Sequence, residues 1–228
     1  MNAINHKRSG QSNLSRISRV VVPPILVSLF LVLAEILEDS FPRGVQATGT
    51  VGPSPLVTWD KAIFLLVNVK LSSPLLDPMM RLTTHLGSTV FWLGAVALLA
   101  YKRRRKEAFL LLIALSLDIT LNTSLKLLLS RVRPYQVISE ARVLDREGGF
   151  SFPSGHSEAS FLSATFLAAK FPRTLPFLYG LTFAVAYSRI YVGAHWPLDV
   201  VAGAIAGLAV AALILLFEKQ ILRIVHLQ

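Results

Sequence analysis

The sequence predicts an all-α fold, an integral-membrane helical bundle with six transmembrane helices. Of the 228 residues, 53% are hydrophobic and only 16% are charged, and the mean hydropathy is +0.57. A soluble domain needs a larger share of polar residues to cover its surface. Six apolar stretches approach the roughly 20 residues that cross a hydrocarbon core. These stretches are 20–37, 86–101, 107–129, 155–170, 174–191 and 197–217. Because no internal repeat or soluble second domain is visible, residues 1–228 are predicted to form a single membrane domain.

The first apolar stretch follows a basic segment, residues 1–19, which contains Lys7, Arg8, Arg16 and Arg19. One interpretation of this arrangement is a cleaved secretion signal, since Val45-Gln46-Ala47 resembles a small-x-small cleavage site. That site lies far beyond the apolar run, which favours an uncleaved first helix.

The region between the first two stretches is mixed. Residues 41–58 are rich in glycine and proline, which predicts loop and turns. The pattern over 60–71 is weakly amphipathic, and Pro74 and Pro78 are expected to break any helix that follows it. We therefore expect one or two helices lying along the membrane interface. Packing and substrate access are equally good interpretations of their role.

Basic residues in short loops predict the orientation. The run 102–106 is entirely Lys and Arg, and further pairs come after the fourth and sixth stretches. Cytoplasmic loops are enriched in such residues, so both termini are predicted to be cytoplasmic. Most basic residues on the opposite side fall in or beside three short segments, 126–134, 153–156 and 188–199. These segments are therefore expected to face outward from the cell membrane.

Composition also excludes several classes of function. The net charge of +10 could indicate nucleic-acid binding, but no basic recognition helix or aromatic platform is visible, so no nucleic-acid partner is predicted. The chain has no cysteine, which excludes disulfides, thiolate zinc sites and cysteine nucleophiles.

Polar residues recur at a spacing of four on the third stretch. Asp118, Asn122 and Lys126 thus form one stripe on a helix. Lys126 alone could snorkel to the interface, but Arg133 lies two helical turns further on, and Pro134 is expected to end the helix there. Both cations could then converge on one anion. For Asp118, a structural role in orienting a neighbour is favoured over a catalytic one.

The sequence Pro153-Ser154-Gly155-His156 opens the fourth stretch. Proline suits a first helical turn, Ser154 can cap it, and Gly155 allows close approach to the backbone. Free N–H groups at a helix start attract anions, and His156 could reach such an anion. Glu158 is interpreted as a solvated or helix-end charge.

The third segment combines Arg189 with His195 and Asp199. The last two are four residues apart at the head of the sixth stretch, hence on one helical face, with Pro197 in the first turn. A carboxylate at this spacing can hold one imidazole nitrogen protonated and leave the other as a nucleophilic lone pair. The alternative is a structural His/Asp pair at a helix start. Arg189 adds a planar donor suited to phosphoryl oxygens.

The three segments, K-x6-R-P, P-S-G-H and S-R-x5-H-x3-D, resemble the signature motifs of the type 2 phosphatidic acid phosphatase (PAP2) family. They occupy residues 126–199, and the layout is most similar to bacterial lipid phosphatases acting on phosphatidylglycerophosphate or undecaprenyl pyrophosphate. The resemblance implies that His195 forms a phosphohistidine, that Asp199 orients it, and that His156 protonates the leaving oxygen. It implies no metal and no cofactor. The implied phosphate-binding residues are Lys126, Arg133, Ser154, Gly155 and Arg189.

The predicted function is thus hydrolysis of a terminal phosphate from a lipid monophosphate or diphosphate, with membrane lipids as partners. Undecaprenyl pyrophosphate and phosphatidylglycerophosphate are favoured, and phosphatidic acid is a third candidate. Two alternatives stay open: a phosphotransferase with a non-water acceptor, and a non-catalytic protein that binds or moves lipid phosphates. The motifs do not fix the substrate or the oligomeric state.

Overall fold

The computed structural model describes residues 54–227, and all the regular structure in this range is helical. The first predicted stretch, its cleavage alternative and the basic N-terminal segment lie outside the described residues. The all-α prediction is confirmed for the part that is described. The elements are α2 (Ser54–Leu65), η1 (Leu66–Lys70), α3 (Asp77–His85), α4 (Thr89–Tyr101), α5 (Arg105–Leu129), α6 (Pro134–Val137), α7 (Gly155–Lys170), η2 (Pro172–Thr174), α8 (Leu175–Tyr191) and α9 (Pro197–Ile224).

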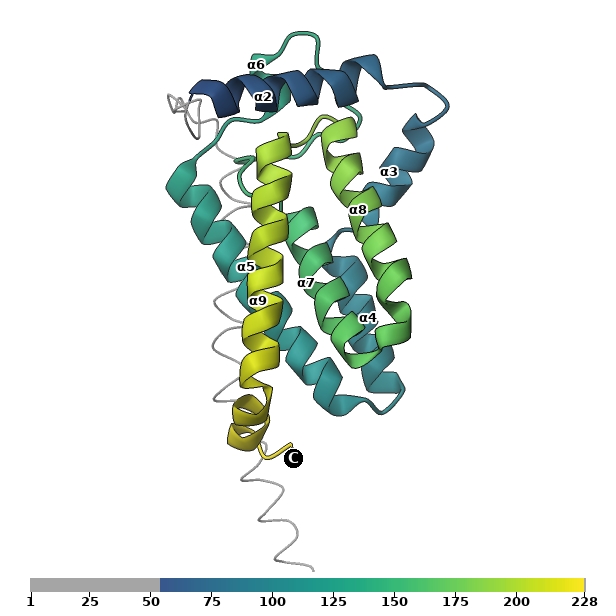
Figure 1. The fold of residues 1–228 in the computed structure, drawn as a ribbon, viewed down its shortest axis with the longest axis vertical. Helices are drawn as coiled ribbons and strands as arrows, with labels where there is room; N and C mark the ends of the chain where they lie inside the picture. The colour runs from purple at the N-terminus through teal and green to yellow at the C-terminus, as the bar shows by residue number, and fades with distance from the viewer. Residues whose placement is uncertain (1–53, 228) are drawn as a thin grey trace, which may run out of the picture.

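Five predicted stretches correspond to α4, α5, α7, α8 and α9, which run along one another in the bundle (Figure 1). Most of their boundaries agree within three residues. Helix α9 runs seven residues further than its apolar run, to Ile224. Hydropathy marks where the apolar run stops, whereas charged and amide residues such as Glu218, Lys219 and Gln220 are good helix formers and extend the helix.

Within residues 54–227, two helical segments are long and apolar enough to cross a membrane, Arg105–Val137 and Pro197–Ile224. A third span results if α3 and α4, bent by 52°, are taken together. Helices α7 and α8 have only 16 and 17 residues, so six spans remain a prediction. The outer surface of the bundle is strongly apolar, as lipid contact requires. Its most exposed side chains include Val90, Leu128, Phe177 and Leu216.

The bundle is apolar towards the α4–α5 turn and polar at the other end. At the α4–α5 end the core is built mainly from α5, α7 and α9, with Leu110, Leu111, Leu115, Leu162, Phe166 and Ile214 among the buried residues. At the opposite end many of the buried residues are polar or charged, and they include Arg131, Arg133, Ser154, Arg189, His195 and Asp199. Burial of so many charged groups requires partners, so this end of the fold is the natural place for a site.

Two glycines bring α9 into backbone contact with α7. A Cβ on Gly203 would lie 2.4 Å from the carbonyl oxygen of Ser154, and one on Gly207 would lie 2.2 Å from that of Glu158. No other residue fits at such distances. The close contact sets the start of α7 directly against the start of α9, which places the second motif beside the third.

Helix α2 lies across the polar end of the bundle (Figure 1). The predicted loop over 41–58 is wrong at its described end, because α2 begins at Ser54 with Pro55 in its first turn. The predicted interruption at Pro78 is also wrong, since this residue lies in the first turn of α3. A proline there loses no intrahelical hydrogen bond, so it favours helix starts.

Candidate active site

Helix α5 carries the predicted polar stripe into the protein interior. Asn122 is buried and donates from Nδ2 to Glu158 Oε2 at 2.6 Å. Asp118 is also buried and lies close to the Glu158 carboxyl. Its structural role in orienting a neighbour stays a prediction. Glu158 does lie at a helix end, in the first turn of α7, but the prediction that it is solvated is wrong: its side chain is fully buried, because it faces Asn122 and Asp118 on α5.

Arg133 is not on the same helix as Lys126. The residue Ser130 adopts a left-handed conformation (φ 46°) and ends α5, and Pro134 begins the short helix α6 rather than ending α5. Arg133 therefore lies in an extended link and is almost fully buried. Its guanidinium donates to the carbonyl oxygens of Gly148 (2.6 and 3.0 Å) and Ala194 (3.0 Å).

The second motif lies at the start of α7: Pro153 and Ser154 precede the helix, and Gly155 and His156 open it, so the predicted place of Pro153 in the first turn is wrong. Ser154 is the residue before the helix, but its hydroxyl does not cap it. The Ser154 Oγ is buried and has no hydrogen-bond partner among residues 54–227. An unpartnered buried hydroxyl is costly unless a ligand satisfies it. Gly155 lies against the Asn122 side chain, with 3.2 Å from its ideal Cβ position to Asn122 Oδ1.

His195 precedes α9 instead of lying on it, since the helix begins at Pro197. Its Nδ1 is 2.7 Å from the carbonyl oxygen of Ser151 and 3.6 Å from Asp199 Oδ2. A carbonyl oxygen only accepts hydrogen bonds, so Nδ1 carries the proton and Nε2 is left with the lone pair. Asp199 Oδ2, which lies near the same Nδ1 proton, also accepts from the Trp196 backbone N–H at 2.9 Å.

Arg189, in the last turn of α8, is completely buried. It donates to Asp145 Oδ2 at 3.0 Å and also hydrogen bonds to Thr84 and Glu147. These partners come from α3 and from the loop between α6 and α7. Arg189 therefore joins three separate parts of the chain at the polar end.

The Glu147 carboxylate lies where the motif side chains converge. One oxygen pairs with Arg189 and lies 3.5 Å from His156 Nδ1, while the other is 3.1 Å from Arg133 Nη1 and 3.4 Å from His195 Nε2. Burial alone would raise the pKa of the Glu147 carboxyl, but the guanidinium groups of Arg189 and Arg133 hold it well below its usual range. One anion thus contacts two arginines and both histidines.

Glu147 was missed by the sequence analysis, because it belongs to none of the three motifs. The only local hint is the Gly148-Gly149 pair beside it, where Gly149 has a positive φ of 60°. The donors around its carboxylate suit an anion that carries several oxygens on one central atom. Phosphoryl oxygens could accept from the same donors.

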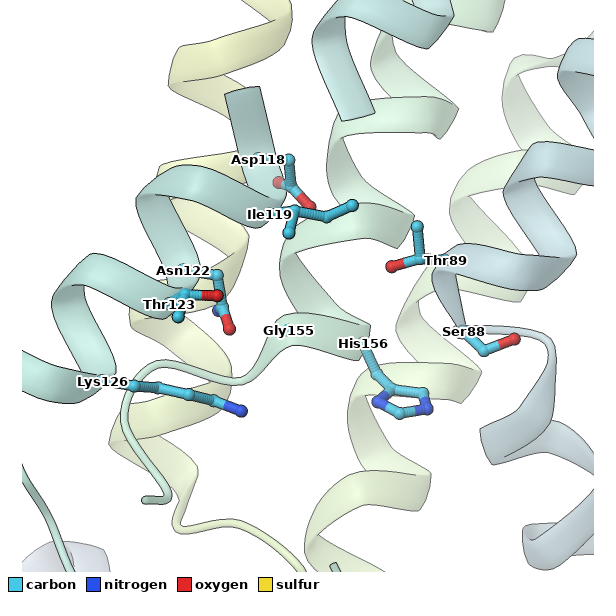
Figure 2. A pocket seen from close by; sticks show the side chains of 9 residues that line it. All are labelled: Ser88, Thr89, Asp118, Ile119, Asn122, Thr123, Lys126, Gly155 and His156. Atoms are coloured by element: carbon cyan, nitrogen blue, oxygen red, sulfur yellow. The ribbon is translucent and has the colours of Figure 1, made fainter. Parts of the chain in front are cut away.

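A pocket of about 180 Å³ opens beside this position, between α4, α5 and α7 (Figure 2). Lys126 and His156 point into it from opposite sides, and the Ser88 and Thr89 side chains border it from α4. Lys126 therefore belongs to the site, because it lines this pocket. Six of the eight predicted site residues line this pocket or contact the Glu147 carboxylate. Of the other two, Asp199 lies next to His195, and Ser154 directly precedes Gly155. Arg133 and His195 reach the site from links rather than from helices.

Comparison with known proteins agrees with this geometry. Residues 107–223 match the PAP2 superfamily. The chain is 30% identical over 187 residues to an undecaprenyl-diphosphatase of Sulfolobus acidocaldarius, covering 80% of this chain and 84% of that protein. It is 31% identical over 170 residues to phosphatidylglycerophosphatase B of Bacillus subtilis, covering 68% and 81%.

A solved structure shares the fold. The crystal structure of the first transmembrane PAP2-type phosphatidylglycerolphosphate phosphatase from Bacillus subtilis superposes with a TM-score of 0.66 at 26% identity, covering 87% of this chain and 96% of that one. With its three complete motifs gathered at one end of the bundle, the chain belongs to the PAP2 superfamily and is an enzyme of its phosphatase class.

Proposed function

We propose that this protein hydrolyses the terminal phosphate of a lipid monophosphate or diphosphate through a phosphohistidine on His195. The observation that carries the proposal is the convergence of Arg133, Arg189, His156 and His195 on the single carboxylate of Glu147. A phosphoryl group in that place meets a nucleophile, an acid and two planar cations at once.

Substrate binding begins with an exchange of anions. The terminal phosphate takes the place of the Glu147 carboxylate and accepts hydrogen bonds from the guanidinium groups of Arg133 and Arg189. Lys126, on the pocket wall, and the Ser154 hydroxyl, which has no partner within residues 54–227, add donors. Donors already fixed in a buried site stabilise the charge that develops on the equatorial oxygens without reorganising.

The first chemical step transfers the phosphoryl group to the protein. The His195 Nε2 lone pair attacks phosphorus, the bond from phosphorus to the lipid oxygen breaks, and His156 donates a proton to that oxygen. The Ser151 carbonyl and Asp199 hold the Nδ1 proton of His195, which stabilises the positive charge of the ring.

The second step restores the enzyme. His156, now neutral, takes a proton from a water molecule whose oxygen attacks the same phosphorus atom. The phosphorus–nitrogen bond breaks, His195 regains its lone pair, and inorganic phosphate leaves.

The location of the site fits a lipid substrate at the extracytoplasmic side of the cell membrane. The site occupies the end of the bundle opposite the α4–α5 turn, which carries the run of five basic residues at 102–106 (Figure 1). Since such runs favour the cytoplasm, the site faces outward. The lipid tail can remain in the bilayer beside α4 and α5 while the headgroup enters the pocket.

Undecaprenyl pyrophosphate and phosphatidylglycerophosphate are the favoured substrates, and phosphatidic acid is the third. The names of the two relatives support this choice. All three lipids offer a terminal phosphate to the same cations, so selection depends on how the rest of the lipid fits. A panel of these lipids, compared by kcat/KM, ranks them.

Replacing His195 tests the proposed chemistry. We expect His195→Ala to lower phosphate release from detergent-dispersed lipid phosphates by at least about 10³-fold. His85→Ala is the control, because this exposed histidine on α3 lies outside the site. Undiminished turnover in His195→Ala would remove this residue as the nucleophile.

A further inference from the structure

A buried chain of charges outside the three motifs connects α2 to Asp199. Arg131 hydrogen bonds to Asp60 on α2 through one terminal nitrogen, and through the other to Asp199 Oδ1 at 2.5 Å. The three residues are 2%, 2% and 0% exposed. Asp60 belongs to a region in which the sequence showed no functional signal, and Arg131 is not one of the motif positions.

The two oxygens of Asp199 have different tasks. Oδ1 accepts from Arg131, while Oδ2 accepts from the Trp196 N–H at 2.9 Å and faces His195 Nδ1 at 3.6 Å. Arg131 therefore fixes the rotation of this carboxylate. Without that bond, Oδ2 would be free to turn away from the imidazole.

Asp60 holds the other end of the same arrangement. One of its oxygens pairs with Arg131, and the other accepts from the backbone N–H of Leu198 at 2.8 Å. Leu198 lies between His195 and Asp199, so a single side chain of α2 anchors both the guanidinium and the segment that carries the nucleophile.

Aromatic side chains cover the buried charges of Asp60, Arg131 and Asp199. The Arg131 guanidinium lies 5.1 Å from the ring centroid of Trp196, whose Nε1 donates to the Val132 carbonyl at 2.9 Å. Phe64, one turn after Asp60 on α2, packs against the same indole with 5.4 Å between ring centroids. Water is thereby kept from the charges, which strengthens their interaction.

The charge balance suggests more than a structural role. Two carboxylates share one guanidinium, so this group carries one net negative charge next to His195. Buried ion pairs contribute little to stability compared with apolar residues of similar size, because desolvating the charges is costly. A negative charge beside the imidazole, by contrast, stabilises the ring as it becomes positive during phosphoryl transfer.

We propose that Asp60 and Arg131 are positioning residues for the His195 nucleophile, acting through Asp199, so that α2 is part of the catalytic apparatus. The proposal rests on the proposed function of His195. It predicts an effect on the chemical step rather than on substrate binding, since neither side chain contacts the position of the phosphate.

The test replaces Asp60 with asparagine, which keeps the shape and removes the charge. We expect kcat for lipid phosphate hydrolysis to fall by on the order of 10²-fold, as for a nucleophile displaced by about 1 Å, with KM changed less than about threefold. Arg131→Gln, which removes the shared cation, should lower kcat in the same way. Asp77→Asn is the matched control, since Asp77 forms a partly exposed pair with Arg142 at 2.7 Å and does not contact Asp199.

Competitive inhibition by inorganic phosphate distinguishes positioning from loss of folding. If Asp60→Asn binds inorganic phosphate like the wild type while kcat is lost, the positioning role is supported. A kcat equal to that of Asp77→Asn, or a parallel loss of kcat and phosphate binding, overturns it. A wild-type protein that is no more active than His195→Ala would instead refute the proposed function, and this inference with it.

Discussion

Removing the charge of Glu147 should make the site bind phosphate more tightly. In the structure its carboxylate occupies the position expected for the phosphate, paired with Arg189 and Arg133. A hydrogen bond to a charged group contributes about 1.5–3 kcal/mol. Because the Glu147 side chain is 24% exposed, the lower end of this range applies. If Glu147 no longer competes for the two arginines, the free energy of binding an external anion becomes more favourable by about 1.5 kcal/mol. This corresponds to roughly tenfold tighter binding.

The assay is competitive inhibition of lipid phosphate hydrolysis by inorganic phosphate. We expect the inhibition constant to fall about tenfold in Glu147→Gln, whereas Glu140→Gln, an exposed acid of the same loop, should leave it unchanged. An unchanged or raised inhibition constant in Glu147→Gln would show that the carboxylate does not compete with phosphate.

The same variant gives a pH test. The pKa of the Glu147 carboxyl lies well below its usual range, so the group stays negative throughout the assay range and its charge is lost only in stronger acid. The ratio of inhibition constants between wild type and Glu147→Gln should thus be the same at about pH 5.5 and about pH 8. A ratio that shrinks towards pH 5.5 would mean that Glu147 is protonated there, contrary to the environment described.

Two further changes test packing and the phosphate contacts. Gly207→Ala should destabilise the protein by about 1–3 kcal/mol, because the new Cβ meets the Glu158 carbonyl at 2.2 Å, and thermal unfolding in detergent measures this. Gly180→Ala is its control, since a Cβ there has no described atom within 4 Å; equal melting temperatures would refute the close contact. Ser154→Ala should keep full stability, because its buried hydroxyl lacks a partner in the described chain, yet lower kcat/KM about tenfold. Ser163→Ala, which removes a comparable hydroxyl elsewhere on α7, should change neither quantity, and a wild-type kcat/KM in Ser154→Ala would exclude its contact with phosphate.

The parts of the fold that depend on periodicity were predictable. The bounds of α7 agree with the sequence, because the apolar run covers residues 155–170 and the Pro153-Ser154 pair directly precedes the helix. The stripe of Asp118, Asn122 and Lys126 also results from helical spacing. The gathering of the motifs was predictable from the family resemblance, since composition alone does not bring residues 126–199 together.

The links between helices were not predictable in the same way. The position of His195 before α9 depends on a contact with a distant segment, the Ser151 carbonyl. Glu147 and Asp60 were not predicted for a similar reason. Each is one acidic residue without a motif, and each has a partner far away along the chain: Arg189 is 42 positions from Glu147, and Arg131 is 71 positions from Asp60.

These overlooked acids explain how a strongly cationic site can exist before substrate arrives. Buried guanidinium groups without counterions would destabilise the fold. Asp60 and Asp199 neutralise Arg131 deep in the protein, whereas Glu147, together with Asp145 on Arg189, neutralises Arg133 and Arg189 from a loop next to two glycines. The first arrangement would preserve the geometry of the proposed nucleophile, and the second could be exchanged. A terminal phosphate, with up to two charges and three free oxygens, replaces a carboxylate well. The phosphodiester of an ordinary bilayer lipid, with one charge and two free oxygens, gains little by the exchange. Glu147 would thus favour terminal phosphates at a membrane surface where phosphodiesters are in large excess.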